Sequence, residues 1–433
     1  MRRLILFAVL AVALASGPQH AVASKAIQPV LTWNELALDT VRTESLGAFP
    51  AARVYAMVNI AMYDAVNGIN MASGWPRAMA LVSADGAPSL SNASRRAATM
   101  AAAHAVLSAL YPNLAGLYDS QLADDLAALP GTQTFIEAGQ QWGESVGQQI
   151  VALRANDGSS PSETQPGDSA PGEFRADWGS AQYRNMTPFG IDDPVAYLSA
   201  GPPALTSTEY ADAFNEVKAL GNAAIPDQNK EEIFRFWRGG GGTARPPGEW
   251  IKIALTVAPD HSFTKYSISR TVRLFALLSM ALGDSAVTSA DSKFTYHFWR
   301  PTTAIQNADT DGNPDTEQDS TWAPRNGSIG GSPEHTSGQS TFAGAGSTIM
   351  AEFYCDDNIT FSFTGDNAIA GERTFGSFSE AAAEAGRARI FAGIHFEFSN
   401  QAGQSAGRDL AREILDNQLL LTSGATHNGS CPL

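Results

Sequence analysis

Cysteine and positive charge are both scarce in this chain of 433 residues. It has two cysteines, Cys355 and Cys431, and its 28 lysines and arginines stand against 44 aspartates and glutamates. Two cysteines cannot supply the Cys-rich ligand sets of structural zinc sites. A formal net charge of -16 repels nucleic acid and anionic lipid surfaces, so we expect neither as a partner. A local cluster of Lys and Arg in such an acidic chain would attract a small anion.

Long apolar runs are also scarce. The first, at residues 4–15, follows two arginines and precedes the small residues 21–23, an order typical of a secretory signal. It is short for the ~20 residues that span a bilayer, and no later stretch qualifies. We therefore predict a signal peptide at residues 1–23 and a secreted or periplasmic mature chain without a membrane partner, with a membrane anchor as the alternative. In that oxidising setting the two cysteines could form a disulfide that ties down the C-terminal tail, or remain free buried thiols.

Patterns typical of β-strands are few, and no repeat of fixed period is evident. Helical spacing dominates instead, so we predict an all-α fold built from one helical bundle or a pair of them. Long loops rich in Gly and Pro are expected at residues 157–171, 239–248 and 307–333, where binding residues tend to lie. The predicted helices cover residues 34–43, 51–67, 94–110, 114–128, 134–156, 207–220, 227–237, 266–282, 284–299, 338–353, 377–390 and 400–420.

The sequence KFTYHFWRP at residues 293–301 places a lysine and an arginine seven positions apart. Lys293 and Arg300 could therefore project from one face of a helix that Pro301 ends. Arginine donates through a planar fork and lysine as a point charge, the usual combination around phosphate-like groups. Two solvated surface cations are the ordinary alternative.

A second block, PEHTSGQSTF at residues 333–342, runs from a loop into a helix of small residues. Ser337 offers a hydroxyl, Gly338 lets a backbone N–H approach a ligand closely, and the helix N-terminus favours negative charge. The alternative is an ordinary Ser N-cap.

A third block, ARIFAGIHF at residues 388–396, combines an arginine with a histidine. Arg389 can donate to an oxyanion, and His395 can reach the central atom of that anion as a ligand or nucleophile. A lone histidine is more often structural, but this one accompanies two other cationic blocks.

In this order, Lys-x6-Arg-Pro, Ser-Gly and Arg-x5-His resemble the signature shared by vanadium-dependent haloperoxidases and the type 2 phosphatidic acid phosphatase superfamily. The stretch AMVNIAMYDAVN at residues 56–67 and the Gly-rich residues 236–250 are similar to the bacterial haloperoxidase-like branch. The resemblance thus covers nearly all of the mature chain. It implies one haloperoxidase-like domain at residues 24–433, in which an N-terminal helical group at about 33–156 packs against a catalytic bundle at about 205–420.

The resemblance also implies the cofactor and the roles of single residues. The oxygens of vanadate, or of a substrate phosphate group, would be held by Lys293, Arg300, Ser337, Gly338 and Arg389. His395 would bind vanadium directly, or attack phosphorus in a phosphatase. In the haloperoxidase case, hydrogen peroxide binds to vanadate, Lys293 polarises it, and halide attacks to give a hypohalous species.

Gln339 departs from the family pattern, which has a histidine after Ser-Gly that acts as acid and base. Glutamine can form hydrogen bonds but cannot exchange a proton near neutral pH. We therefore expect His335 or His297 to substitute, or turnover to be slow. His335 is the preferred substitute, since a loop residue could fold back over the pocket, and His335→Ala is then expected to lower turnover without abolishing vanadate binding.

Three functions remain open at this point. The leading one is a vanadate-dependent haloperoxidase, followed by an exported acid phosphatase with His395 as the nucleophile, which would act on a phosphate ester. A catalytically weak oxyanion-binding protein is the third. In addition, residues 309–315 alternate oxygen-bearing side chains as calcium loops do, although Pro314 stands where the turn glycine belongs, and a plain acidic turn is the alternative.

Overall fold

A computed structural model describes residues 26–75 and 77–422, and within them the chain forms thirteen α-helices and four short strands. The helices are α1 (Gln28–Thr43), α2 (Ala48–Ala72), α3 (Asn92–Leu110), α4 (Ala115–Ala127), α5 (Gln133–Leu153), α6 (Thr208–Leu220), α7 (Gln228–Phe236), α8 (Arg245–Val257), α9 (Ile268–Tyr296), α10 (Pro301–Gln306), α11 (Gly338–Tyr354), α12 (Phe378–Phe391) and α13 (Glu397–Asn417). The predicted all-α fold is confirmed.

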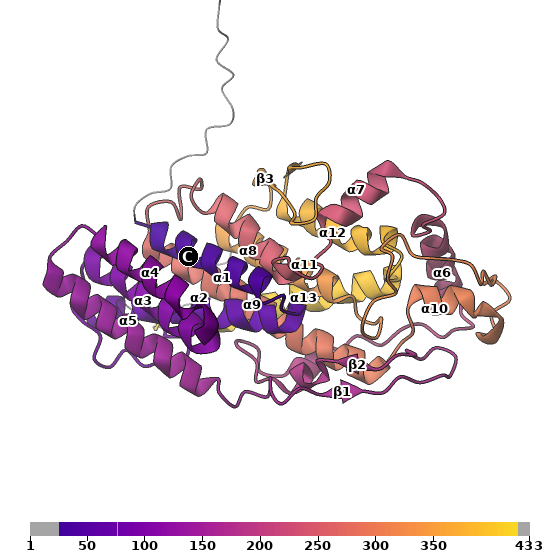
Figure 1. Cartoon of the computed structure of the whole chain (residues 1–433), viewed down its shortest axis with the longest axis horizontal. Helices are drawn as coiled ribbons and strands as arrows, with labels where there is room; N and C mark the ends of the chain where they lie inside the picture. Colours follow the sequence, from indigo (N-terminus) through magenta and orange to yellow (C-terminus); the bar gives the residue numbers. More distant parts are fainter. Residues whose placement is uncertain (1–25, 76, 423–433) are drawn as a thin grey trace, which may run out of the picture.

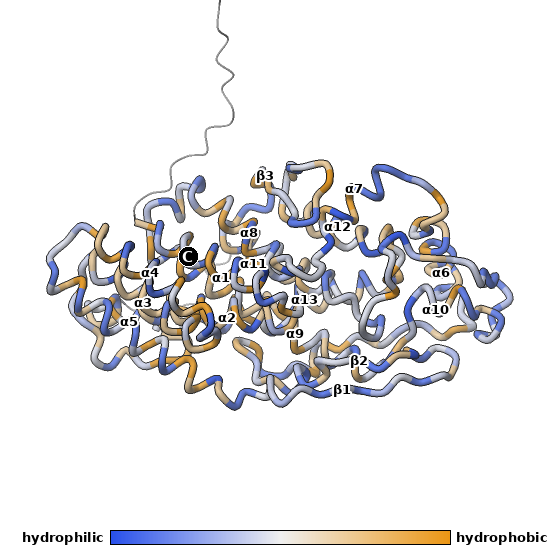
Figure 2. Tube along the Cα trace, viewed as in Figure 1, coloured by the Kyte–Doolittle hydropathy of each residue, from blue (hydrophilic) through white to orange (hydrophobic). Residues whose placement is uncertain are grey.

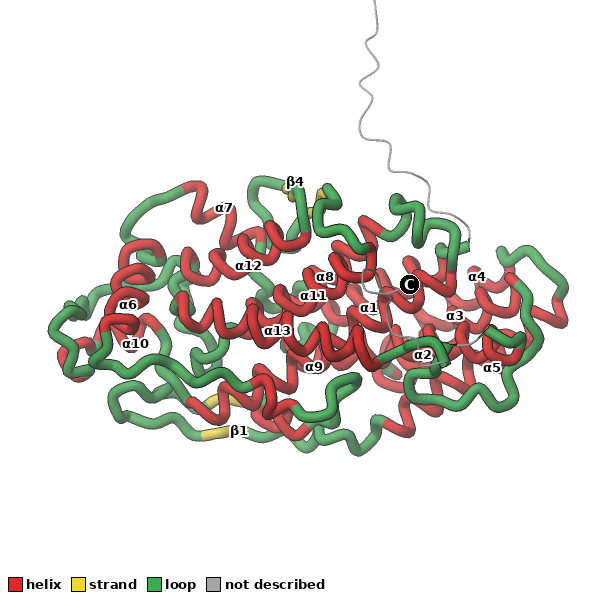
Figure 3. Tube along the Cα trace, turned by 180° about the vertical axis from the view of Figure 1, so that it is seen from behind, coloured by secondary structure: helices red, strands yellow, loops and turns green. Residues whose placement is uncertain are grey.

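The strands form two small antiparallel hairpins outside the helical layers. β1 (Thr164–Gln165) pairs with β2 (Trp178–Gly179), and β3 (Phe361–Phe363) pairs with β4 (Arg373–Phe375). Figure 3 shows both hairpins at the edges of the molecule. Short 3-10 turns occur at η1 (Pro112–Leu114), η2 (Ala181–Asn185), η3 (Pro194–Tyr197) and η4 (Ala308–Thr310).

The helices form two groups along an elongated molecule. Figure 1 shows α1–α5 at one end and α6, α7 and α10 at the other, with α9 between them. Figure 2 shows hydrophobic residues along the helices and hydrophilic stretches in the outer loops. In the N-terminal group, α5 carries Gly139, Gly143 and Gly147 against the Ala-rich α3. A Cβ on Gly143 would lie 2.2 Å from the carbonyl oxygen of Ala98, so the small residues set the close approach of these helices.

The central helix α9 differs from the sequence prediction in two ways. One helix spans residues 268–296 where two were expected, and it ends at His297, whose left-handed φ of 45° breaks the helical path. Pro301 begins α10 instead of ending the preceding helix, because a proline at the first helical position loses no hydrogen bond. Lys293 therefore lies on α9 and Arg300 is the residue before α10, so the two do not share one helical face.

The helix α8 was also not expected, because its first residues lie in a segment predicted as loop 239–248. Two prolines occupy its first turn, where backbone N–H groups have no helical partner. The sequence prediction treated these prolines as loop residues. In the structure they begin a helix, which packs against α11 and α2.

We expected no stretch after the first apolar run to be long and apolar enough to span a membrane, and by length and composition α9 contradicts this expectation. α9 has 29 residues and an 18-residue window of mean hydropathy 1.2, and that window is wholly buried inside the protein. It is the core helix of the fold. The predicted signal peptide at residues 1–23 and Cys431 lie outside the described residues, so export and the disulfide remain predictions, as does the single domain at 24–433.

Candidate functional site

A cavity of about 390 Å³ lies between the loop before α8 and residues 326–332. The end of α9, the start of α11 and the end of α12 complete its wall. Its cationic lining residues are Arg238, Arg245, Lys293, Arg300 and Arg389. No aspartate or glutamate among the described residues lines it. In a chain with a net charge of -16, this concentration of positive charge favours a small anion.

Backbone carbonyls hold two of these cations in place. Lys293 Nζ donates to the carbonyl oxygens of residues 333 and 334, at 2.6 and 3.3 Å. Arg300 Nε donates to Ser332 O at 2.8 Å, and its Nη1 donates to Ile394 O at 2.7 Å. Gly330, at φ +93°, lies against this guanidinium, where a Cβ would stand 2.8 Å from Arg300 Cζ. The loop can therefore cover the arginine only with glycine at this position.

Arg389 is the least compensated of the cations that line the cavity. Its Nε is buried without a hydrogen-bond partner among the described residues. Burial, with added repulsion from Arg300 and Arg238, lowers the pKa of Arg389 to about 9. Burial also lowers the pKa of Arg300 to about 10, and burial and Arg300 together hold the pKa of Lys293 well below its usual value. Buried charges without partners are costly, so an oxyanion fits this set of donors.

His395 faces the cavity with a nitrogen lone pair, because Glu334 binds the other side of its ring. His395 Nδ1 lies 2.8 Å from Glu334 Oε1, which also accepts the N–H of Phe396 at 3.0 Å. When Glu334 is ionised its carboxylate only accepts, so Nδ1 donates to it and Nε2 keeps its lone pair. Arg300 Nη1 donates to that lone pair at 2.9 Å. Once the hydrogen bond from Arg300 is given up, this neutral imidazole can act as a metal ligand or a nucleophile through Nε2.

The charges around this pair favour the neutral histidine. Burial, and then Arg300 and Lys293, hold the pKa of His395 well below its usual value. Burial raises the pKa of Glu334 to about 7, against the pull of the same two cations. Sequence reasoning missed Glu334, although it lies within the second block. The available signal was chemical, since a histidine that presents one nitrogen needs an acceptor for the other.

Gln339 lines the cavity and offers it an acceptor. Its Nε2 donates to Trp237 O at 2.8 Å, and a carbonyl oxygen accepts only from the amide nitrogen, which orients the group. The Oε1 is buried and has no donor among the described residues. Gln339 is therefore placed to accept a hydrogen bond from a bound ligand, and it cannot take up a proton.

Ser337 does not line the cavity, although its neighbours Gly338 and Gln339 do. Its Oγ accepts the hydroxyl of Ser340 at 2.8 Å and the N–H of the same residue at 3.4 Å, as the N-cap of α11. The structure thus shows Ser337 as an ordinary N-cap, which was the alternative considered for this serine. The expected oxygen-holding role of its hydroxyl is not supported by this arrangement.

His335 also lies outside the cavity lining, with 1% of its surface exposed. Its Nε2 is 2.6 Å from Ser199 Oγ, and its ring packs beside Tyr296 and Phe398. Burial, with Lys293 adding repulsion, lowers its pKa to about 3. The structure thus corrects the expectation that His335 folds back over the pocket, because apolar packing holds the ring in the protein interior.

His297, the second expected substitute, is also absent from the cavity lining. Its Nδ1 lies 3.0 Å from Glu173 Oε2, and the residue caps α9.

The loop at residues 309–315 uses its side-chain oxygens in hydrogen bonds within the loop: Asp311 accepts from Asn313 and Thr316, at 2.8 Å each. Across residues 26–75 and 77–422, no group of three His, Cys, Asp or Glu side chains is arranged to hold a metal ion.

These observations define a class of protein: a helical protein in which two groups of helices pack together and a cationic cavity contains a histidine. Residues 273–423, which include Lys293, Arg300, Gly338, Arg389 and His395, match the family model described as the VCPO second helical-bundle domain. The vanadium chloroperoxidase of Curvularia inaequalis is 25% identical over 185 residues, which are 36% of this chain and 30% of that enzyme. The aligned part is thus under a third of that relative.

Solved structures extend the likeness to most of the chain. A bacterial vanadium-dependent iodoperoxidase has a TM-score of 0.73 at 21% identity, covering 91% of this chain and 97% of its own. A bacterial vanadium-dependent chloroperoxidase has TM-scores of 0.63 in its apo form and 0.62 in its holo form, at 12% and 13% identity, covering 86% and 85% of this chain and 94% and 92% of its own. The chain has the fold of vanadium haloperoxidases, and the resemblance stated from the sequence is confirmed.

Proposed function

We propose that this chain is a vanadate-dependent haloperoxidase that oxidises halide with hydrogen peroxide. The observation that carries the proposal is a cavity lined by five cations and no described carboxylate, into which His395 presents Nε2. Lys293, Arg300 and Arg389 would hold the oxygens of vanadate, and His395 Nε2 would bind the vanadium in place of the hydrogen bond that it accepts from Arg300 Nη1. Bound vanadate supplies the Lewis acidity that makes hydrogen peroxide an oxygen donor toward halide.

The residues of the chain would orient the reactants and supply a proton. Gln339 can only hydrogen-bond, and the described lining offers His395 and Lys293 as its titratable groups other than arginine. Two of the three ammonium hydrogens of Lys293 are directed at carbonyl oxygens, which leaves one for a bound peroxide. Its lowered pKa makes this ammonium a better proton donor, so we assign it the proton transfer that the missing histidine would perform.

The test is to purify the mature chain, reconstitute it with orthovanadate, and compare peroxide-dependent bromination with hydrolysis of p-nitrophenyl phosphate. We expect bromination that depends on vanadate and falls as phosphate is added. Hydrolysis without bromination would overturn the proposal in favour of an acid phosphatase with His395 as nucleophile. A bound anion with neither activity would indicate a weak oxyanion-binding protein.

Export belongs to the same proposal, since the apolar run and small residues before position 24 are typical of a secretory signal. Mass spectrometry of the protein recovered outside the cytoplasm should give an N-terminus at Ser24. Recovery of the intact chain with Met1 from the cytoplasm alone would contradict export without affecting the assignment of the cavity.

A further inference from the structure

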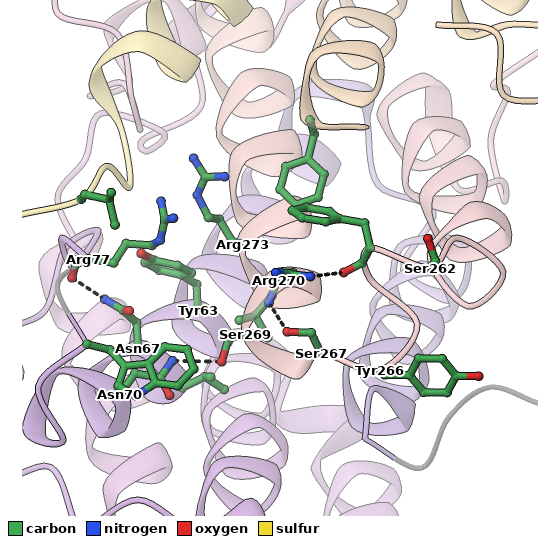
Figure 4. Close-up of a pocket in the computed structure, with 16 residues that line it drawn as sticks. Tyr63, Asn67, Asn70, Arg77, Ser262, Tyr266, Ser267, Ser269, Arg270 and Arg273 are labelled. Atoms are coloured by element: carbon green, nitrogen blue, oxygen red, sulfur yellow. Dashed lines mark hydrogen bonds between the residues drawn. The ribbon is translucent and has the colours of Figure 1, made fainter. Parts of the chain in front are cut away.

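A second cavity, of about 480 Å³, lies between α2, the loop from α8 to α9, and Leu421 (Figure 4). It shares no lining residue with the first cavity. Arg273 lines this second cavity and Lys293 lines the first, and both lie on α9. At ~1.5 Å of rise per residue the two positions are about 30 Å apart. The second cavity is therefore separate from the proposed vanadate site.

Three arginines line the second cavity: Arg77, Arg270 and Arg273. No described aspartate or glutamate lines it, and Arg77 and Arg270 form no ion pair in the part of the chain that the structure describes. Figure 4 shows the guanidinium groups of Arg77 and Arg273 close together beside the ring of Tyr63. Their mutual repulsion adds to burial in lowering the pKa of Arg273 to about 10. The cavity is thus strongly cationic in an acidic protein.

The positive charge extends behind the wall of the cavity. Arg95 Nη1 approaches Asn70 Oδ1 and Ser269 Oγ, each at 3.4 Å, and both of these residues line the cavity. Its Nε is buried without a partner among the described residues. Burial lowers the pKa of Arg95, and no carboxylate counteracts that shift. An anion in the cavity would therefore be attracted by a fourth guanidinium.

Aromatic rings form much of the remaining surface. Trp75 and Tyr266 line the cavity yet are 52% and 70% exposed, so their rings are open to a ligand. Phe263 and Phe353 form part of the wall. Exposed rings beside arginines suit a molecule that has both a flat apolar body and an acidic group, since guanidinium groups bind carboxylates in a two-pronged manner and rings stack.

We propose that this second cavity binds a small organic anion with an aromatic body. Its carboxylate or sulfonate is held by Arg77 and Arg270, the positive charge of Arg273 adds to the attraction, and its ring contacts the aromatic lining. The volume lies within the roughly 300–1,000 Å³ of small-molecule sites. Because the lining holds three positive charges and no described negative one, the charge of the ligand decides its affinity. This proposal does not depend on the function of the first cavity.

The test uses the full chain with phosphate present to occupy the first cavity. The anionic probe is 8-anilinonaphthalene-1-sulfonate, followed by fluorescence and isothermal titration, and the neutral probe of similar shape is N-phenyl-1-naphthylamine. Arg270→Met removes one cavity cation whose guanidinium donates to Phe263 O at 3.4 Å and lies over the Phe263 ring, and the fold should tolerate the loss of these two contacts. Arg412→Met, on the exposed face of α13, is the matched control. Circular dichroism checks that both variants fold.

We expect one anionic probe per chain, binding that is about tenfold weaker in Arg270→Met, and no change in Arg412→Met. Binding of the neutral probe should be weak and equal in all three proteins. Equal affinity of the anionic probe for wild type and Arg270→Met would overturn the proposal. So would the absence of saturable binding of the anionic probe by the full chain.

Discussion

Replacing Glu334 by glutamine separates the two effects that this carboxylate has on the cavity. The amide oxygen of glutamine can still accept from His395 Nδ1 and from the N–H of Phe396, so the position of the ring should be kept. The negative charge is lost. Oxyanion binding should therefore strengthen, because one repulsive charge is gone, while turnover should fall, because the imidazole becomes a weaker ligand.

The magnitude follows from the distances. Glu334 Oε1 is 2.8 Å from Nδ1, and an anion on the cavity side of the imidazole ring would lie roughly 7 Å from the carboxylate. At an effective dielectric constant of about 20, two unit charges at that distance interact by ~2 kcal/mol. Phosphate should thus bind about 30-fold more tightly to Glu334→Gln. Loss of such an outer partner typically lowers activity by ~10- to 100-fold.

The assay is isothermal titration with phosphate at pH 8.5 and pH 5.5, together with vanadate-dependent bromide oxidation. Glu334 has a pKa raised to about 7, so it is charged at the higher pH and protonated at the lower one. The gain in phosphate affinity should appear at pH 8.5 and shrink at pH 5.5. Glu397→Gln is the control, since Glu397 pairs with Arg387 at 2.7 Å outside the cavity lining. Weaker phosphate binding at pH 8.5, or unchanged bromide oxidation, would refute the reasoning.

Three further predictions concern single side chains. Gln339→His should raise kcat for bromide oxidation by ~100-fold, because it adds an acid and base at the cavity, while phosphate affinity measured by titration stays within a few-fold. Arg389→Met should weaken phosphate binding by ~10- to 100-fold, the loss of ~1.5–3 kcal/mol from a charged hydrogen bond, with Arg412→Met unchanged. Asp284 is wholly buried on three backbone N–H groups, and burial raises its pKa to about 6 from an unfolded value of ~3.9. The folded state then holds that proton more tightly, so stability falls as pH rises through about 6. Relative to Asp284→Asn, wild type should lose ~3 kcal/mol of unfolding free energy between pH 4 and 7.5 in urea titrations, and a constant difference would contradict this.

The cationic cavity could be predicted because its residues lie in three short blocks with regular spacing. Lys293, Arg300, Arg389 and His395 all line it, even though the first two are not on one helix as expected. The prediction that these residues would meet in one cavity rested on the family resemblance and on residue type. Neither depends on the exact end of α9, so an error in the helix boundary did not move the site.

The partners of these residues could not be predicted from local sequence. Glu334 precedes His335 in the chain, but its carboxylate binds His395, because the fold and not adjacency decides which ring it meets. Ser337 uses its hydroxyl to cap α11, a choice between two ordinary roles that the sequence leaves open. His335 is enclosed by aromatic rings from two other segments, and that packing is visible only in three dimensions.

The central claim is that this cavity binds vanadate through His395, and vanadium-51 nuclear magnetic resonance during an orthovanadate titration tests it most directly. We predict one equivalent of bound vanadate in the wild-type protein, displaced by phosphate. His395→Ala should lose the bound vanadium signal while it keeps phosphate affinity within a few-fold, because the cations remain. Absence of a bound signal in wild type, or an unchanged signal in His395→Ala, would contradict the claim.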